Sequence, residues 1–321
     1  MTTNTSKTLS LADIQAARGR IAGSVIRTPL IRLNVTDAPA EIYLKLENLQ
    51  PIGSFKLRGA GHAIALATPE QLAKGVYTAS AGNMAQGVAW HARRLGIPCT
   101  VVVPDHAPET KLAAITRLGG TFIKVTFDEW WQVVVTHHFE GLDGFFVHPV
   151  SDPAVMAGNG TIGLEILEDL PDVGAILVPY GGGGLSCGIA TAVRALKPAT
   201  KIYAAEVETS AAFAAALKAG EAVKIDYQAS FVDGIGSGRV LDDMWPLART
   251  LLDGSLVSSL AEVAEAVRIL AERNRVIAEG AGATPVAAAL AGKAGGGKVV
   301  CVVSGGNIDF EKLTKIFKRE I

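Results

Sequence analysis

A lysine in apolar surroundings is the first group in this chain whose type and position could do chemistry. Lys56 lies between Phe55 and Leu57, and Ser54 is the expected cap of a helix that follows. Apolar surroundings destabilise the charged form of an amine, which lowers its pKa. A neutral amine can attack a carbonyl and form a Schiff base. A solvated surface lysine is the alternative, unless other stretches supply a cofactor for Lys56 to hold.

Four consecutive glycines, Gly181 to Gly184, could bind an anion. They separate an apolar strand expected over residues 175–180 from a helix expected over 186–196. Such a loop lets backbone N–H groups point inward at a helix N-terminus, whose partial positive charge favours phosphate. A flexible turn is the alternative, but four adjacent glycines cost conformational entropy. We therefore interpret the loop as a phosphate site.

The identity of the phosphate compound stays open on these residues alone. No Gly-Lys-Ser/Thr follows the glycines, so the loop is not a nucleoside-triphosphate P-loop. A dinucleotide fingerprint would need a glycine where Ser186 or Cys187 stands. Glu206 does end the next strand, where a ribose-binding acid would lie. A nucleotide-binding protein without lysine chemistry therefore remains an alternative.

Two further turns follow expected strands and carry polar groups. In Ser80-Ala81-Gly82-Asn83-Met84, the backbone amides could hold a carboxylate and the Asn83 amide could bond a phenolic oxygen. A plain turn with asparagine in the left-handed region is the alternative. Ser304, in Ser-Gly-Gly-Asn, ends the last buried strand and could face a ligand crevice. Glu279 begins a turn of small residues and, taken alone, is a helix-end acid.

Strands and helices alternate along most of the chain, which predicts an α/β fold with parallel sheets. Expected strands cover residues 76–79, 99–103 and 121–125, and later 175–180, 201–205 and 298–303. A helix is expected over residues 260–278. We predict two open, twisted lobes with helices on both faces: a large domain over residues 1–52 and 147–321, and a smaller one inserted over residues 53–146.

Composition narrows the class of protein. The chain has 321 residues, is 49% hydrophobic and carries a net charge of −1, which argues against nucleic acid or an anionic membrane as partner. Cys99, Cys187 and Cys301 are few and far apart, as in a protein with reduced thiols. No apolar run is long enough for a membrane span, and no signal peptide is evident. We expect a cytoplasmic protein.

Taken together, four motifs resemble a known family. They are Gly-Ser-Phe-Lys-Leu-Arg-Gly-Ala, Ser-Ala-Gly-Asn-x-Ala-Gln-Gly, Gly-Gly-Gly-Gly-Leu and Ser-Gly-Gly-Asn, in this order. The combination resembles the pyridoxal-phosphate enzymes of the tryptophan synthase β-subunit fold, or fold type II. Within them it is most similar to the threonine/serine dehydratase and serine racemase branch. The resemblance runs over about residues 9–309 and implies a cofactor cleft between the lobes.

The resemblance also implies roles for individual residues. Lys56 would form the Schiff base with pyridoxal 5′-phosphate, and the Ser80–Met84 turn would take the substrate carboxylate. A neutral serine at the pyridine nitrogen, in place of a carboxylate, should favour prompt loss of a β-leaving group. The implied cofactor contacts are Phe55, Lys56, Asn83, Gly181, Gly182, Gly183, Gly184, Leu185, Gly234, Glu279 and Ser304.

The chain departs from this family at several positions. Racemases of the branch resemble it but carry a second serine where this chain has Ala81, which cannot carry a proton. Met84 stands where dehydratases often have histidine, and predicts a larger pocket and a bulkier substrate such as phenylserine, with neutral variation as the alternative. Ala212 replaces an aspartate that accompanies Glu206 in cation-binding relatives. We therefore expect no bound metal, although a loosely held monovalent ion stays open.

We therefore predict a homodimeric dehydratase, or ammonia-lyase, that converts threonine, serine or phenylserine to a 2-oxo acid and ammonia. A racemase or β-replacement enzyme on the same fold is the alternative. We expect no C-terminal regulatory domain, since only twelve residues follow Asp309. His137-His138 is interpreted as a surface pair, and Trp130-Trp131 as packing at a lobe edge.

Overall fold

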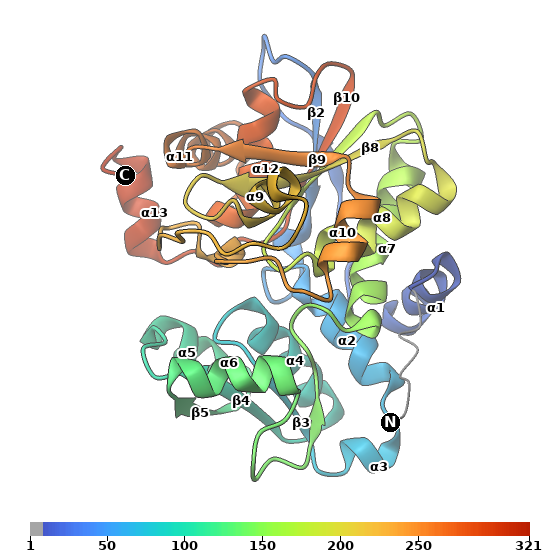
Figure 1. Ribbon diagram of the computed structural model, residues 1–321, viewed down its shortest axis with the longest axis vertical. Helices are drawn as coiled ribbons and strands as arrows, with labels where there is room; N and C mark the ends of the chain where they lie inside the picture. The colour runs from blue at the N-terminus through green and yellow to red at the C-terminus, as the bar shows by residue number, and fades with distance from the viewer. Residues whose placement is uncertain (1–8) are drawn as a thin grey trace.

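The computed structural model describes residues 9–321; the first eight residues of the predicted large domain lie outside this range. Within it the strands form a six-stranded and a four-stranded sheet, in separate lobes (Figure 1). The sheet of the large lobe has the spatial order β1 (Leu30–Arg32), β2 (Glu41–Leu46), β10 (Lys298–Val303), β7 (Ala175–Pro179), β8 (Lys201–Val207) and β9 (Gly254–Ser258). The sheet of the small lobe has the order β5 (Thr121–Val125), β4 (Cys99–Pro104), β3 (Val76–Ala79) and β6 (Phe145–Phe146).

Helices cover both faces of each sheet, as the α/β pattern predicts. In the large lobe α1, α7, α8, α9 and α10 pack on one face and α11, α12 and α13 on the other. In the small lobe α2, α4 and α5 cover one face and α6 the other. The helices are α1 (Leu11–Ile21), α2 (Lys56–Leu66), α3 (Pro69–Leu72), α4 (Asn83–Leu95), α5 (Glu109–Arg117), α6 (Phe127–Thr136), α7 (Pro153–Asp169), α8 (Gly184–Leu196), α9 (Ala212–Ala219), α10 (Trp245–Leu251), α11 (Leu260–Ile269), α12 (Gly280–Leu290) and α13 (Phe310–Phe317).

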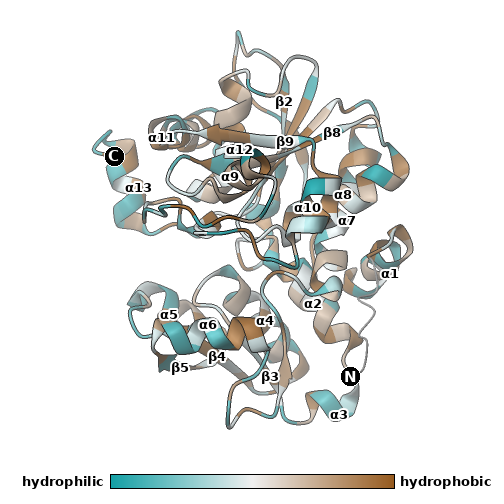
Figure 2. Cartoon of the chain, in the orientation of Figure 1, coloured by the Kyte–Doolittle hydropathy of each residue, from teal (hydrophilic) through white to brown (hydrophobic). Residues whose placement is uncertain are grey.

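The strands alternate between these two apolar layers because successive side chains point to opposite sides of a sheet. On β7, Ile176 and Val178 join the layer with α8, whereas Ala175 and Leu177 join the layer with α12. Hydrophobic residues accordingly concentrate on the strands and on the helix faces that meet them (Figure 2). All neighbouring strands run parallel except β1, which pairs antiparallel with β2 at the sheet edge.

Two expected elements are wrong in detail. The helix expected over residues 260–278 ends earlier, because a π-helical turn leads to Arg275 in the left-handed region. The small-residue stretch after Glu279 is helix α12 rather than a turn. Its residues through Ala289 are all buried, so it shows none of the apolar periodicity by which a surface helix is recognised. Among the described helices, none is long and apolar enough to cross a membrane.

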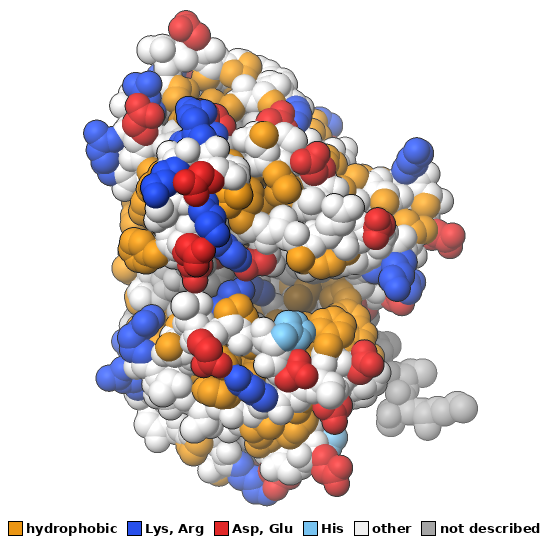
Figure 3. Space-filling view, turned by 90° about the vertical axis from the view of Figure 1, so that its left-hand side faces the viewer, with side chains coloured by type: hydrophobic (Ala, Val, Ile, Leu, Met, Phe, Trp, Pro, Cys, Tyr) orange, Lys and Arg blue, Asp and Glu red, His pale blue; other side chains and the backbone are white. Residues whose placement is uncertain are grey.

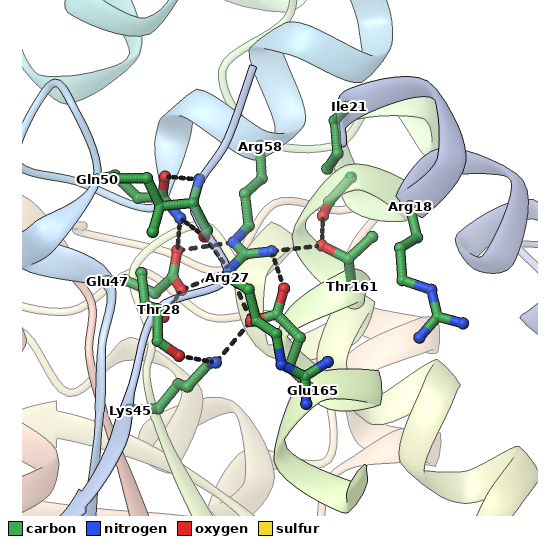
Figure 4. A network of polar contacts seen from close by, with 12 residues as sticks. Arg18, Ile21, Arg27, Thr28, Lys45, Glu47, Gln50, Arg58, Thr161 and Glu165 are labelled. Atoms are coloured by element: carbon green, nitrogen blue, oxygen red, sulfur yellow. Dashed lines mark hydrogen bonds and ion pairs between the residues drawn. The ribbon is translucent and has the colours of Figure 1, made fainter. Parts of the chain in front are cut away.

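A buried network of charges joins α2 to the large lobe (Figure 4). The Arg58 guanidinium donates to both Glu47 oxygens at 2.8 Å and to the Glu165 oxygens at 2.7 and 2.9 Å. Lys45 donates to Glu165 at 2.5 Å and to the Thr28 carbonyl oxygen at 2.6 Å. The two cations and two carboxylates are therefore paired at a site closed to solvent.

Removing the guanidinium should be strongly destabilising. Arg58→Ala leaves Glu47 and Glu165 buried without their main partner, so we expect the free energy of unfolding to fall by about 3–5 kcal/mol. Urea denaturation followed by circular dichroism measures it. Arg18→Ala is the control, since Arg18 forms a solvent-exposed pair with Glu168 and its loss should cost at most about 1 kcal/mol. Equal losses in the two variants would contradict this account.

The network should also make stability depend on pH. Burial alone would raise the pKa of Glu47, but Arg58, Thr28 and Lys45 outweigh burial and hold that pKa below its usual value. A lowered carboxyl pKa stabilises the fold at neutral pH, and this contribution disappears as the pH falls through the folded-state pKa. The difference in unfolding free energy between wild type and Glu47→Gln should therefore be constant above about pH 5 and shrink as the pH falls below the ordinary carboxyl value of 4.5. A pH-independent difference would contradict the assignment.

Candidate active site

A cavity of about 640 Å³ lies between the two lobes. Figure 3 shows the hollow between the lobes from one side of the molecule. Four turns that follow the carboxyl ends of β2, β3, β7 and β10 reach this cavity, which is where open α/β sheets place their ligands. The lining includes every site residue predicted from the sequence: Phe55, Lys56, Ser80, Ala81, Gly82, Asn83, Met84, Gly181, Gly182, Gly183, Gly184, Leu185, Gly234, Glu279 and Ser304.

Lys56 is the first residue of α2, with Phe55 in the N-cap position. Ser54 is therefore not the N-cap, although its hydroxyl accepts the Lys56 backbone N–H at 3.4 Å. The Lys56 Nζ lies 5.3 Å from the centre of the Phe55 ring and donates to the Pro149 carbonyl oxygen at 2.5 Å. Burial lowers the pKa of Lys56 to about 8, with Glu279 opposing the shift. A large neutral fraction is therefore available just above neutral pH.

The glycine loop has the geometry of an anion site. Gly183 has φ of 92°, which glycine adopts without strain, and helix α8 begins at the next residue. In the described chain no protein group accepts the backbone N–H groups of residues 181–185. A Cβ at Gly184 would come within 2.3 Å of the Val150 carbonyl oxygen, so only glycine fits there. The loop thus offers free N–H donors at the positive end of a thirteen-residue helix.

Asn83 connects the small lobe to the large lobe at this cavity. Its Nδ2 donates to Glu279 Oε1 at 2.9 Å, and its Oδ1 accepts from Asn307 Nδ2 at 2.8 Å. Burial and the nearby Asp233 raise the pKa of Glu279 to about 7, against the Asn83 hydrogen bond. Glu279 therefore carries only part of its charge at neutral pH.

Ser304 lies beside the start of α2. The Phe55 backbone N–H donates to the Ser304 carbonyl oxygen at 3.0 Å, and the Gly306 N–H donates to the Gly53 carbonyl oxygen at 2.9 Å. These two bonds tie the last strand of the large sheet to the segment that carries Lys56. The Ser304 side chain is buried and lines the cavity, so the site offers a neutral hydroxyl at this position.

Sequence reasoning missed several residues of the site. The Pro149 carbonyl oxygen accepts from Lys56, and Val150 lies close against Gly182 and Gly184 of the glycine loop; the sequence carries no signal for either contact. Asn307 was visible in its motif, but its contact with Asn83 was not. The interpretation of Trp130-Trp131 as lobe-edge packing is incomplete, because both side chains line the cavity.

An ion pair crosses the cavity mouth. Asp233 of the large lobe accepts from Lys111 on α5 at 3.2 Å and from Lys312 on α13 at 3.2 Å. All three residues line the cavity and remain partly exposed. Lys111 and Asp233 therefore form a direct polar contact between the small and the large lobe.

The Glu206 carboxylate is bound by protein N–H groups rather than left free for a ribose or a metal ion. Its carboxylate accepts the backbone N–H groups of Phe213 at 2.7 Å and Ala214 at 2.8 Å at the start of α9. Burial raises the pKa of Glu206, while Ser255 and these two amides oppose the shift. Residues 9–321 contain no group of three or more metal-ligating side chains.

An amine of lowered pKa beside an anion cradle defines a class of enzymes that bind a phosphorylated aldehyde through a lysine. Comparison with known proteins agrees. The family model described as "Pyridoxal-phosphate dependent enzyme" matches residues 21–305. The L-threonine ammonia-lyase of Geobacter sulfurreducens is 44% identical to this chain, and the match covers 95% of this chain and 77% of the relative. The L-threonine ammonia-lyase of Thermotoga maritima is 40% identical, and the match covers 97% of this chain and 79% of the relative.

A solved structure shows the same fold. The structure of maize serine racemase superposes with a TM-score of 0.88 at 32% identity, covering 97% of both chains. The chain therefore belongs to the family of pyridoxal-phosphate dependent enzymes, and its cofactor is pyridoxal phosphate. The site fits this group: Lys56 suits its aldehyde, the free amides of the glycine loop its phosphate, and the Ser304 hydroxyl its ring nitrogen.

The lowered pKa of Lys56 predicts how the apoprotein takes up the cofactor. Because the neutral amine reacts, the rate at which pyridoxal phosphate gives visible absorbance should rise with pH through a midpoint of about 8. Stopped-flow absorbance between pH 6 and pH 10 measures it, and Lys56→Ala should give no such band. A midpoint near the ordinary lysine value of 10.5 would contradict the burial argument.

The tight contact at Gly184 predicts a loss of cofactor affinity. In Gly184→Ala the new methyl group must push the loop away from Val150, so the Kd for pyridoxal phosphate should rise about tenfold or more. Titration of the apoprotein followed by absorbance measures it. Gly19→Ala is the matched control, because no heavy atom lies within 4 Å of its Cβ. An unchanged Kd in Gly184→Ala would remove the loop from the phosphate site.

Proposed function

We propose that this enzyme converts a 3-hydroxy amino acid to a 2-oxo acid and ammonia by α,β-elimination. The observation that carries the proposal is that Lys56, the glycine loop and the Ser80–Met84 turn line one cavity. The two bacterial relatives are named L-threonine ammonia-lyases, which supports threonine as a substrate. L-serine and a bulkier analogue such as L-phenylserine belong to the same chemical class.

Each group has a task in this proposal. Bound pyridoxal phosphate supplies an electron sink that makes the Cα proton of an amino acid acidic. The backbone amides of the Ser80–Met84 turn, at the start of α4, orient the substrate carboxylate. Lys56, with its pKa of about 8, removes the proton from Cα. Ser304 is uncharged and, unlike a carboxylate, would not favour a proton on the ring nitrogen, so the ring would withdraw less electron density, which favours departure of the β-hydroxyl over a long-lived carbanion.

The reaction balances without any further reactant. The Cα–H and Cβ–O bonds break and water leaves. Water then returns to release ammonia, so threonine yields 2-oxobutanoate and ammonia. Since no oxidant is consumed, the pocket needs only to place one base at Cα and to hold the carboxylate.

A racemase is the main alternative, since maize serine racemase shares the fold. Racemisation by two bases needs a proton carrier on the face of the substrate opposite Lys56. Ala81 lies in the predicted position for that carrier and has no ionisable group. A β-replacement enzyme would share every group described above, and only its product, an amino acid instead of a 2-oxo acid, distinguishes it from a dehydratase. The nucleotide alternative loses its best support, because Glu206 caps α9.

We also propose a cytoplasmic homodimer. Cys99, Cys187 and Cys301 are all free and buried, which suits a reducing compartment. Light scattering of the purified protein tests the dimer.

An assay panel tests the reaction. The holoenzyme should release one 2-oxo acid per ammonia from L-threonine, and Lys56→Ala should lower kcat by at least about 10³-fold, since it lacks the base. Chiral chromatography of the remaining amino acid checks for racemisation, of which we expect none. Accumulation of D-amino acid without 2-oxo acid would favour the racemase. Chiral chromatography of the Ala81→Ser variant then measures whether a second proton carrier introduces racemisation.

A further inference from the structure

One face of α6 forms an aromatic wall of the cavity. Trp130 and Val134 are four residues apart and Trp131 and Val134 three apart, so the three side chains share a helix face. All three line the cavity. Trp130 is half-buried and packs on Phe127, with ring centroids 5.5 Å apart, whereas Trp131 is 39% exposed. Two large aromatic surfaces thus border the space in which a substrate must lie.

Hydrogen bonds connect this wall to the segment that binds Lys56. The His148 Nδ1 accepts the backbone N–H groups of Val150 and Ser151, so its Nε2 carries the proton and donates to the Val134 carbonyl oxygen at 3.2 Å. The next residue, Pro149, accepts from Lys56. His148 therefore bridges α6 and the segment that holds the reactive amine, and Trp130 lies one helical turn before Val134.

The wall also adjoins the predicted carboxylate turn. Val134 packs in one apolar cluster with Ala79, the residue directly before Ser80. A substrate with its carboxylate at the Ser80–Met84 turn and its Cα near Lys56 would therefore extend its side chain along α6. The methyl group of threonine is too small to fill that space.

The chemistry of the surroundings favours an apolar ring. Pro104, Pro108 and Ala114 continue the lining, whereas the Met84 side chain is buried in the core of the small lobe. Of the two basic residues on this side, Lys111 is paired with Asp233, and Arg117 is exposed. The wall therefore offers aromatic surface for stacking rather than a site for a charged side chain.

We propose that Trp130 and Trp131 form the side-chain subsite of this enzyme and select aromatic over methyl substituents at Cβ. The inference rests on the proposed function and deepens it: the preferred substrate class is aryl-substituted 3-hydroxy amino acids. Burial of a phenyl ring against two indoles stabilises the bound substrate, whereas a methyl group leaves that surface wet.

Steady-state kinetics of the holoenzyme test the preference. We expect kcat/KM for L-phenylserine to exceed that for L-threonine by about tenfold or more. Trp130→Ala and Trp131→Ala should each lower this ratio about tenfold, since they remove aromatic contact but leave Lys56 in place. Trp90→Ala is the matched control, because Trp90 is a half-buried tryptophan of the same lobe outside the cavity lining. The ratio cancels any loss of folded enzyme.

A binding measurement separates failure of the subsite from failure of the proposed reaction. L-phenylalanine and L-alanine cannot lose a β-hydroxyl, and their binding can be followed by the change in visible absorbance of the holoenzyme. L-phenylalanine should bind at least about tenfold more tightly than L-alanine, and both cavity tryptophan variants should erase the difference. Preferential L-alanine binding, or variants that leave the preference intact, overturns the subsite whether or not 2-oxo acid forms. Tight L-phenylalanine binding without 2-oxo acid from any hydroxy amino acid overturns the reaction alone.

Discussion

The buried pairing of Arg58 with Glu47 and Glu165 is the constraint on which the site depends. Arg58 lies two residues after Lys56 on the same helix, so the bonds that hold its guanidinium also set the position of the reactive amine. Its partners come from the segment after β2 and from α7, and these lie in the large lobe together with the glycine loop. Because a buried charge without its partner is costly, α2 has one stable position against that lobe. The amine is thereby fixed relative to the anion cradle.

The site as a whole gathers short segments from the two lobes that are far apart in sequence. Lys56 and Ser304 meet through the backbone bonds between the start of α2 and the end of β10. Asn83 of the small lobe reaches Glu279 and Asn307 of the large one. The cavity is therefore complete only when the lobes are in contact, as they are in this structure.

Local chemistry made part of this site predictable from the sequence. The role of a glycine run between an apolar strand and a helix, or of a lysine between apolar residues, can be inferred from about ten neighbouring residues. Contacts that span the chain left no such trace: Asn83 and Asn307 are 224 positions apart, and the acceptor for Lys56 is a backbone carbonyl. Helix α12 was missed because it is buried on all sides, and the tryptophan pair because lobe packing and cavity lining use the same residue type. The domain boundaries at residues 52 and 146 stay a prediction, although α2, inside the predicted small domain, is bonded to the large lobe.

The shared carboxylate of Asp233 has a consequence for turnover. Lys111 and Lys312 bind the same side chain from opposite lobes, and all three groups are partly exposed. An exposed ion pair contributes at most about 1 kcal/mol, so thermal motion is enough to break the pair between Lys111 and Asp233. If the Lys111 pair separated, Asp233 would keep its pair with Lys312, so the electrostatic cost of separating the lobes at this point would be small. Dissolved salt screens exposed charges, so the strength of this contact between the lobes depends on ionic strength as well as on the fold.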